Sequence, residues 1–124
     1  MPGDEPFADL LGLEVVEVGS GAATVRGTVG PEHLNAHGIG HGGFVFALAD
    51  HALAMASNSH GPAAVALVAT IHFTRRVQAG ETLVATAREV SLGRSAATYE
   101  VTVATDGGRT VALFTGTVHR RIDA

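Results

Sequence analysis

The stretch "NAHGIGHGGFVFALADHALAMASNS", residues 35–59, decides the fold of this chain. Residues 42–59 predict one long helix, because they are rich in alanine and in other side chains that favour helices or are readily buried. The apolar side chains surround the predicted axis instead of following one stripe, which is typical of a helix buried among other elements. Gly61 and Pro62 then predict its end.

Runs rich in β-branched residues flank the predicted helix. Two precede it, at 13–18 and 22–29, and four follow it, at 64–77, 81–91, 95–105 and 109–120. The later runs are separated by "QAG", "LGR" and "DGG", short turns of the hairpin type, so we expect an antiparallel meander. Residues 31–41 predict a loop, and residues 1–12 predict a lead-in with a short helical turn.

One long helix among six strands sets the expected architecture. The sheet must curl around the helix to bury it, which predicts an α+β hotdog fold, with one long central helix wrapped by a curled antiparallel β-sheet. At 124 residues the chain is expected to be a single domain, 1–124. A curled sheet leaves edge strands and part of the helix uncovered, so we expect a homo-oligomer, either a dimer or a dimer of dimers (a homotetramer).

The composition excludes several classes of function. The sequence has no cysteine, so thiolate zinc sites and a cysteine nucleophile are excluded, and it has no lysine for a Schiff base. A formal net charge of -4 without a basic run argues against nucleic-acid binding. No apolar run is long enough to cross a bilayer, and the acidic start lacks the basic region of a signal peptide, so we expect no membrane partner and a cytoplasmic location.

The helix and its preceding loop resemble the PaaI-like branch of the hotdog acyl-CoA thioesterases, the phenylacetate-degradation type. The similar features are an Asn, then H-G, then H-G-G, and L-A-D on the helix; "IHFTRRVQAGETLVATA" and "GRTVALFTGTVHR" extend the similarity over nearly the whole chain. The resemblance implies a hydrolase of small or aromatic acyl-CoA thioesters, such as phenylacetyl- or hydroxyphenylacetyl-CoA. It implies Asp50 as the catalytic carboxylate, the Gly43 backbone N–H as the thioester oxygen's donor, and Asn35 and His41 as positioning residues.

The residues themselves favour chemistry at Asp50. An ionised carboxylate among apolar neighbours is costly to bury, so it shifts its pKa or serves a function. Thioester hydrolysis needs a general base or a carboxylate nucleophile, and the sequence leaves both open. Gly42 and Gly43 expose N–H groups at a helix start, where an oxyanion is stabilised. Because Gly43 and Asp50 lie about 10 Å apart along the helix, we expect two sites shared between subunits, each with Gly43 of one chain and Asp50 of the other.

The other polar residues give weaker indications. Gly42 and His51 are candidate substrate-binding residues, and the resemblance makes Arg75, Arg76 and Arg94 candidates for contact with the phosphates of coenzyme A. His51 could equally be a satisfied core histidine, and His33, His60 and His119 are expected at the surface or at strand ends. His37 and His41 flank the non-helical "GIG", so no metal or other cofactor is expected; coenzyme A belongs to the substrate. Two other functions stay open, a hotdog enoyl-CoA hydratase or dehydratase and a non-catalytic acyl-CoA-binding module.

Overall fold

A computed structural model describes residues 5–121, so the ends of the expected domain and lead-in, residues 1–4 and 122–124, lie outside the described residues. The helices are α1 (Pro6–Leu11), α2 (Gly42–Ser57) and the short 3-10 turns η1 (Pro31–His33) and η2 (Asn58–His60). The strands are β1 (Glu14–Gly19), β2 (Ala22–Thr28), β3 (Ala64–Phe73), β4 (Thr82–Leu92), β5 (Ala96–Thr105) and β6 (Thr110–Arg120). The prediction of one long central helix is confirmed, and it ends two residues earlier than expected, at Ser57.

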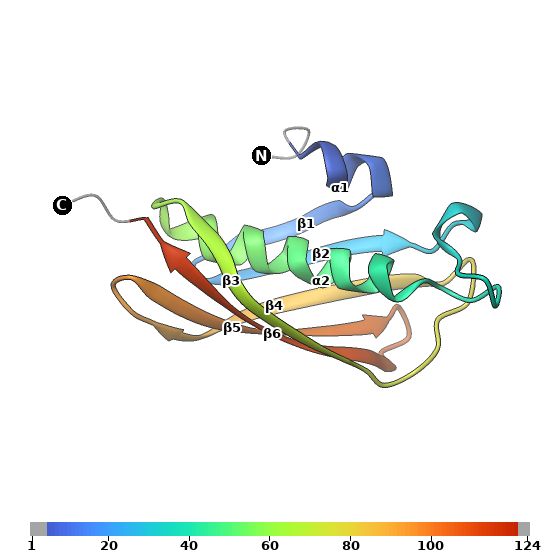
Figure 1. The fold of residues 1–124 in the computed structure, drawn as a ribbon. Coiled ribbons are helices and arrows are strands. Elements are labelled where there is room, and N and C mark those ends of the chain that lie inside the picture. The colour runs from blue at the N-terminus through green and yellow to red at the C-terminus, as the bar shows by residue number, and fades with distance from the viewer. Residues whose placement is uncertain (1–4, 122–124) are drawn as a thin grey trace.

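One antiparallel sheet contains all six strands, in the order β1-β2-β4-β5-β6-β3. The sheet curves, and α2 lies along its inner face while α1 lies beside β1 and α2 (Figure 1). The α+β hotdog fold is therefore confirmed. The expected four-run meander is wrong at its first step: β4, β5 and β6 follow one another, but β3 pairs with β6, and β4 pairs with β2.

The core fills the space between α2 and the sheet. Alternate residues of β5 point inward, and four of them are buried: Ala97, Tyr99, Val101 and Val103. Leu48 and Leu53 of α2 pack against this face and are at most 1% exposed. A Cβ at Gly116 of β6 would lie 2.7 Å from Leu53 Cδ2, so glycine there allows helix and sheet to approach closely. Small residues and β-branched residues thus set the separation of the two layers.

The edges of the sheet are β1 and β3. Most of β3 is exposed on both faces, including Val65, Leu67 and Val68, each at least 60% exposed in the single chain. An edge strand with unpaired backbone groups and apolar side chains is a template for pairing with another strand. Within residues 5–121, no helix has the length and apolar character needed to span a membrane.

Candidate active site

The N-terminus of α2 forms around His41 and Gly43. His41 is the N-cap residue, and its Nδ1 accepts a hydrogen bond from the Gly43 N–H at 2.7 Å. This bond satisfies one of the donors that the first turn of a helix leaves unpaired. Gly43 is exposed, and a Cβ there would lie 3.0 Å from His41 Nδ1, so a side chain at this position would press on the cap. Because Nδ1 accepts, the neutral ring carries its proton on Nε2.

The loop before the helix is held by Asn35. Its Oδ1 accepts hydrogen bonds from the N–H of His37 at 2.9 Å and of Ile39 at 3.4 Å, and its backbone N–H donates to the Ile39 carbonyl at 2.8 Å. The Gly40 N–H donates to the Val77 carbonyl, which ties the loop to the segment after β3. The side-chain oxygen of Asn35 therefore shapes the loop, and its amide NH₂ is the group left to act on a ligand.

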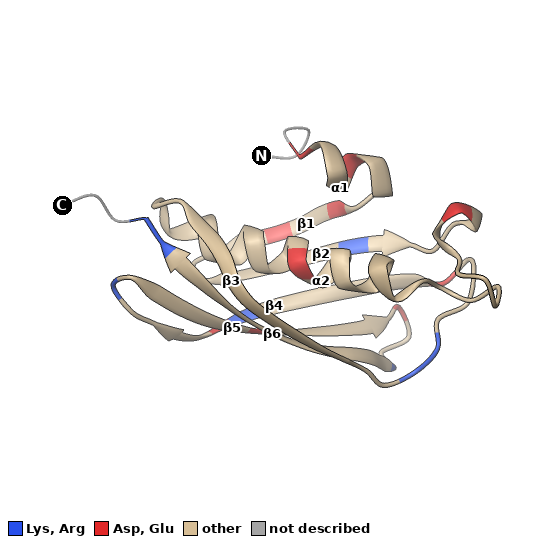
Figure 2. Ribbon diagram, viewed as in Figure 1, with Lys and Arg blue, Asp and Glu red and all other residues tan. Residues whose placement is uncertain are grey.

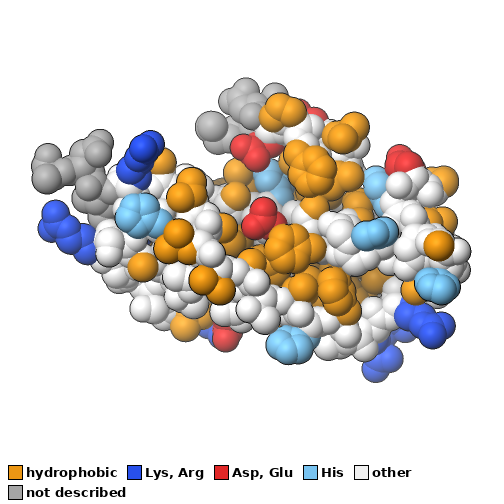
Figure 3. Space-filling view, viewed as in Figure 1, with side chains coloured by type: hydrophobic (Ala, Val, Ile, Leu, Met, Phe, Trp, Pro, Cys, Tyr) orange, Lys and Arg blue, Asp and Glu red, His pale blue; other side chains and the backbone are white. Residues whose placement is uncertain are grey.

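Asp50 lies on α2 seven residues after Gly43, hence on the same face. It is half-buried, and it is the only acidic residue of α2, which Figure 2 shows at the middle of the helix. Burial raises the pKa of Asp50 above its usual range; the charge of His51 opposes this shift and that of Glu5 adds to it. In the space-filling view, an acidic group near the centre of this face has hydrophobic side chains on several sides (Figure 3). A carboxylate in such surroundings is poised to take up a proton.

A small cavity of about 80 Å³ lies beside Asp50 and is called the Asp50 hollow here. Its lining comprises Glu5, Phe7, Ala8, Leu13, Ala47, Asp50, His51 and Ala54. His51 is only 8% exposed, and its Nδ1 lies 4.0 Å from Glu5 Oε1. His51 is therefore buried, as a core histidine would be, and its side chain also lines this hollow.

A second cavity, of about 390 Å³, opens at the start of α2 on the side of β3. It is lined by Ile39, Gly40, Gly42, Val45, Phe73, Thr74, Arg75, Arg76 and Val77, and is called the basic cavity below. Three of the predicted substrate-binding residues, Gly42, Arg75 and Arg76, are thereby brought together.

Arg94 is not part of that group. It lies in the turn between β4 and β5, two residues before Ala96, which pairs with His119 of β6. Phe73, two residues before Arg75, pairs with Ala112 of the same strand. Seven residues along β6 correspond to about 23 Å, so within one chain Arg94 lies at the opposite end of the sheet.

A third cavity, of about 250 Å³, adjoins Gly43 on the side of α1. It is called the apolar cavity below and is lined by Phe7, Leu11, Glu32, His33, Leu34, His41, Gly43 and Phe44. Sequence reasoning assigned no role to Phe7, Leu11 or Leu34, because only the tertiary fold brings α1 and η1 to the helix start. The signal available in the sequence was the spacing of Phe7 and Leu11, which places two apolar side chains on one face of a short helix.

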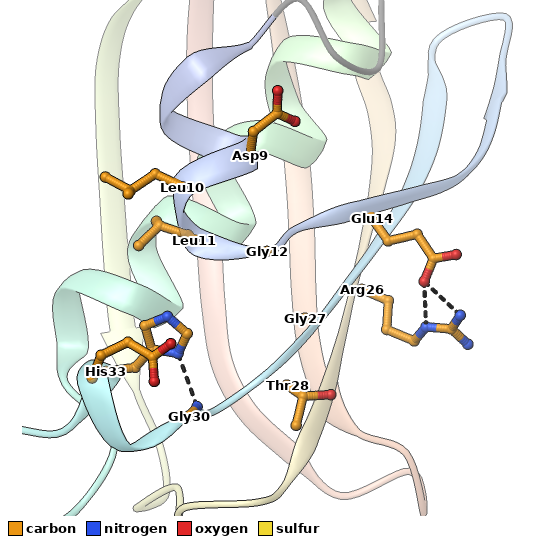
Figure 4. Close-up of a pocket in the computed structure, with 11 residues that line it drawn as sticks. Asp9, Leu10, Leu11, Gly12, Glu14, Arg26, Gly27, Thr28, Gly30 and His33 are labelled. Carbon is orange, nitrogen blue, oxygen red and sulfur yellow. Dashed lines mark hydrogen bonds and ion pairs between the residues drawn. The ribbon is translucent and has the colours of Figure 1, made fainter.

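His33 contradicts the expectation of a surface residue. It is only 9% exposed, its ring stacks on Phe44 with centroids 4.2 Å apart, and its Nδ1 accepts from the Gly30 N–H at 2.9 Å. Figure 4 shows this hydrogen bond at a further hollow of about 300 Å³ between α1, β2 and η1, which is lined by none of the predicted site residues. Among residues 5–121, no three histidine or acidic side chains are grouped so that they could hold a metal ion.

Comparison with known proteins identifies the family. Residues 37–112 match the model of the thioesterase superfamily, which is more than half of the chain. The acyl-coenzyme A thioesterase PaaI of Escherichia coli K12 is 43% identical over 117 residues, which cover 94% of this chain and 84% of that protein.

Solved structures agree with the sequence comparison. The E. coli PaaI structure matches with a TM-score of 0.95 and 41% identity, covering 100% of this chain and 89% of that one. A mutant of the phenylacetic acid degradation protein PaaI from Thermus thermophilus matches with a TM-score of 0.90 and 49% identity, covering 95% and 100%. A Streptococcus mutans protein bound to acetyl CoA matches with 0.84 and 31%, covering 87% of each chain. This chain therefore belongs to the thioesterase superfamily, as a PaaI-like protein with the hotdog fold.

Proposed function

We propose that this protein hydrolyses small or aromatic acyl-CoA thioesters to the free acid and coenzyme A. The observation that carries the proposal is the shared face of α2, where Gly43 begins the helix and Asp50, half-buried and with a raised pKa, follows two turns later. The Gly43 N–H can stabilise an oxyanion, and the Asp50 carboxylate can accept a proton or attack an acyl group. The PaaI relatives, one named for coenzyme A thioesters and one for phenylacetic acid degradation, support the same chemistry.

In the proposed reaction, Asp50 acts on the thioester carbonyl in one of two ways. As a general base it takes a proton from water, which attacks the carbonyl carbon; as a nucleophile its carboxylate attacks directly and forms a mixed anhydride that water then hydrolyses. In both routes the C–S bond breaks and coenzyme A leaves as the thiol after protonation. A single turnover in ¹⁸O-labelled water separates a general base from a nucleophile whose anhydride is hydrolysed at the Asp50 carbon. The first labels the product acid, and the second labels the Asp50 carboxylate.

The Gly43 N–H is proposed to hold the carbonyl oxygen as negative charge develops on it. In the ligand-free chain this N–H donates to His41 Nδ1, so a thioester oxygen that binds there must displace the imidazole. After displacement, the Nε2–H of His41 and the amide of Asn35 are proposed to position the thioester or the attacking water. The basic cavity, with Arg75 and Arg76, is proposed to take the phosphates of coenzyme A.

Each site is proposed to form between two copies of the chain. A carbonyl bound to Gly43 lies about 10 Å along the helix from Asp50 of the same chain, which is beyond attack distance. A partner helix running antiparallel brings its own Asp50 opposite Gly43. The exposed edge strand β3 is proposed to join the copies, because it presents Val65, Leu67 and Val68 together with unpaired backbone groups.

A thiol-release assay tests the proposed activity directly. Acetyl-, phenylacetyl-, hydroxyphenylacetyl-, benzoyl- and octanoyl-CoA are each supplied to the purified protein, and free coenzyme A is measured with a thiol reagent. Enoyl absorbance followed in parallel on crotonyl-CoA detects hydration. Thiol release without loss of the enoyl signal supports the thioesterase; enoyl loss alone supports a hydratase; saturable binding with neither signal supports a binding module.

Mixed dimers test whether the sites are shared. Asp50→Ala removes the carboxylate, and Gly43→Pro removes the N–H donor in the first turn of the helix, where the N–H has no partner within the helix, together with its bond to His41. Co-expressed with different tags and purified as a heterodimer, the two inactive chains should regain up to half the wild-type activity, because one site then has both intact groups. No activity beyond that of either mutant alone would refute the shared site.

A further inference from the structure

The two cavities at the start of α2 differ in the chemistry of their walls. Arg75 and Arg76 give the basic cavity two cationic side chains. The apolar cavity is lined mainly by the carbon side chains of Phe7, Leu11, Leu34 and Phe44. Gly42 lines the first cavity and Gly43 the second, so the peptide between the two glycines separates them. An acyl-CoA has the same division, with anionic phosphates at one end, an acyl group at the other and the thioester between them.

Phe7 is the one residue of α1 that lines the cavities near both Gly43 and Asp50. It lines the apolar cavity beside Gly43 and also the Asp50 hollow. Between those points the helix carries Ala47, whose small side chain leaves room above the helix. Phe7 thus lies over the face of α2 that runs from Gly43 to Asp50, and it is 64% exposed in the single chain.

The size of the apolar cavity limits what it can hold. An apolar cavity of about 150 Å³ admits benzene. The apolar cavity of about 250 Å³ therefore has room for one six-membered ring with a short linker. Glu32 on its lining adds a carboxylate that can accept a hydrogen bond from a ring hydroxyl.

We propose that the apolar cavity is the acyl-binding pocket and that Phe7 of α1 determines which acyl groups enter it. This inference rests on the proposed thioesterase function and adds the substrate-selecting element to it. An arylacetyl group with one ring fills the pocket and packs on Phe7, whereas an acetyl group bound at the Gly43 N–H is too short to reach it. Selectivity for the ring therefore depends on α1, outside the helix that carries the chemistry.

Phe7→Ala tests the proposal in the thiol-release assay. We expect kcat/KM for phenylacetyl-CoA to fall about tenfold, while that for acetyl-CoA changes by less than about twofold. Leu10→Ala is the matched control, because Leu10 lies on the same short helix, is 76% exposed and lines neither the apolar cavity nor the Asp50 hollow. Leu10→Ala should leave the ratio of the two substrates unchanged. An unchanged ratio in Phe7→Ala would overturn the proposal.

Equilibrium binding separates this inference from the proposed activity. In the Asp50→Asn background, titration calorimetry compares the Kd of phenylacetyl-CoA with that of coenzyme A alone. We expect the acyl group to tighten binding, and Phe7→Ala to remove about tenfold of that gain while leaving the Kd of coenzyme A unchanged. Failure of wild-type protein to release thiol from any substrate would refute the proposed function, whereas a gain that survives Phe7→Ala would refute the role of Phe7.

Discussion

The two ends of α2 are built in opposite ways. At the N-terminal end, one side-chain hydrogen bond, from Gly43 to His41, caps the helix, and two cavities open beside it. At the C-terminal end, side chains bind the helix carbonyls and strands alike: the Asn58 amide donates to the carbonyls of Ala54 at 2.8 Å and Ala64 at 3.2 Å. The Ser59 hydroxyl donates to the Ala56 carbonyl and accepts from the Gly21 N–H.

A partly buried polar cluster completes the C-terminal end. Glu89 Oε1 accepts from the hydroxyl of Tyr99 at 2.7 Å and lies 2.6 Å from Nε2 of His60, the last residue of η2. His60 was expected at the surface or at a strand end; it lies in η2 instead, and only 20% of its side chain is exposed, because Glu89 holds it against the sheet. One end of the helix is therefore anchored to β4 and β5 through His60, whereas at the other end the Gly43 N–H is held only by the His41 side chain.

The largest expected effect is on catalysis by Asp50, on the face of α2 that begins at Gly43. Asp50→Asn should lower kcat by about 10³-fold, since it removes the group that takes the proton or attacks the carbonyl. The same change should raise the melting temperature at pH 7. A carboxyl whose folded pKa is raised costs stability once pH exceeds that pKa, and the cost is absent below the pKa of the unfolded chain.

Thermal melts of wild type and Asp50→Asn between pH 3 and pH 8 check the stability part. The two curves should approach each other at the acidic end and separate as pH rises through the pKa of Asp50. Near-wild-type turnover by Asp50→Asn on every acyl-CoA would exclude Asp50 from the chemistry. A lower melting temperature at pH 7 would show that the ionised carboxylate has a stabilising partner.

At the anchored end, Tyr99→Phe should give the opposite result, lower stability with little change in activity. The ring stays buried, but Glu89 loses a hydrogen bond to its charged carboxylate, which costs about 1.5–3 kcal/mol. Chemical denaturation measures the loss, and kcat/KM for a hydrolysed acyl-CoA should stay within about twofold of wild type. A large drop in activity at unchanged stability would contradict the division of the helix into an anchored and a reactive end.

How far the sequence could predict this molecule depends on whether local or distant residues decide each feature. The central helix was predictable, because its alanines and the stop at Gly61 and Pro62 act locally. The neighbour of β3 was not. Residues 74–77 continue a β-rich pattern, so the run appeared to reach the short "QAG" turn. In the fold β3 ends at Phe73, and Val77 is buried with its carbonyl bonded to Gly40, so the connection to β4 spans residues 74–81.

The same reasoning applies to the site. Gly43 and Asp50 could be placed relative to each other because helix geometry fixes seven residues of separation. Arg75, Arg76 and Arg94 were grouped by resemblance and Gly42 was named for its place at the helix start, but only the fold brings Gly42, Arg75 and Arg76 to one cavity and leaves Arg94 apart. Burial of His33 had no local signal, since a histidine in a polar loop is ordinarily exposed; it depends on stacking with Phe44, eleven residues away. Phe7 reaches the helix start only through the path of α1.

Two substitutions at His41 separate its two proposed roles, capping of α2 and positioning of the substrate, with smaller expected effects. His41→Ala should cost about 1 kcal/mol, because the helix loses its N-cap, whereas His41→Asn should keep most of the stability, since Asn is a strong N-cap residue. Both changes remove the imidazole, so both should lower kcat/KM alike if the ring positions substrate. Recovery of activity together with stability in His41→Asn would reduce His41 to a structural cap.

The smallest expected effect concerns Glu89 at the anchored end of the helix. It changes the acid limb of the stability curve, which is the decline of the melting temperature at low pH. Burial alone would raise the pKa of Glu89, but hydrogen bonds from Tyr99 and His60, with the charges of His60 and Arg120, hold that pKa below its usual value. A carboxyl with a lowered folded pKa contributes stability above its unfolded pKa of about 4.3, and this contribution is lost as pH falls through the folded pKa. Glu89→Gln should therefore flatten the decline of the melting temperature below about pH 4.5. Glu100→Gln, which removes an exposed carboxylate paired with Arg88, controls for the loss of one negative charge; an equal flattening there would assign the acid limb to net charge instead of to the Glu89 cluster.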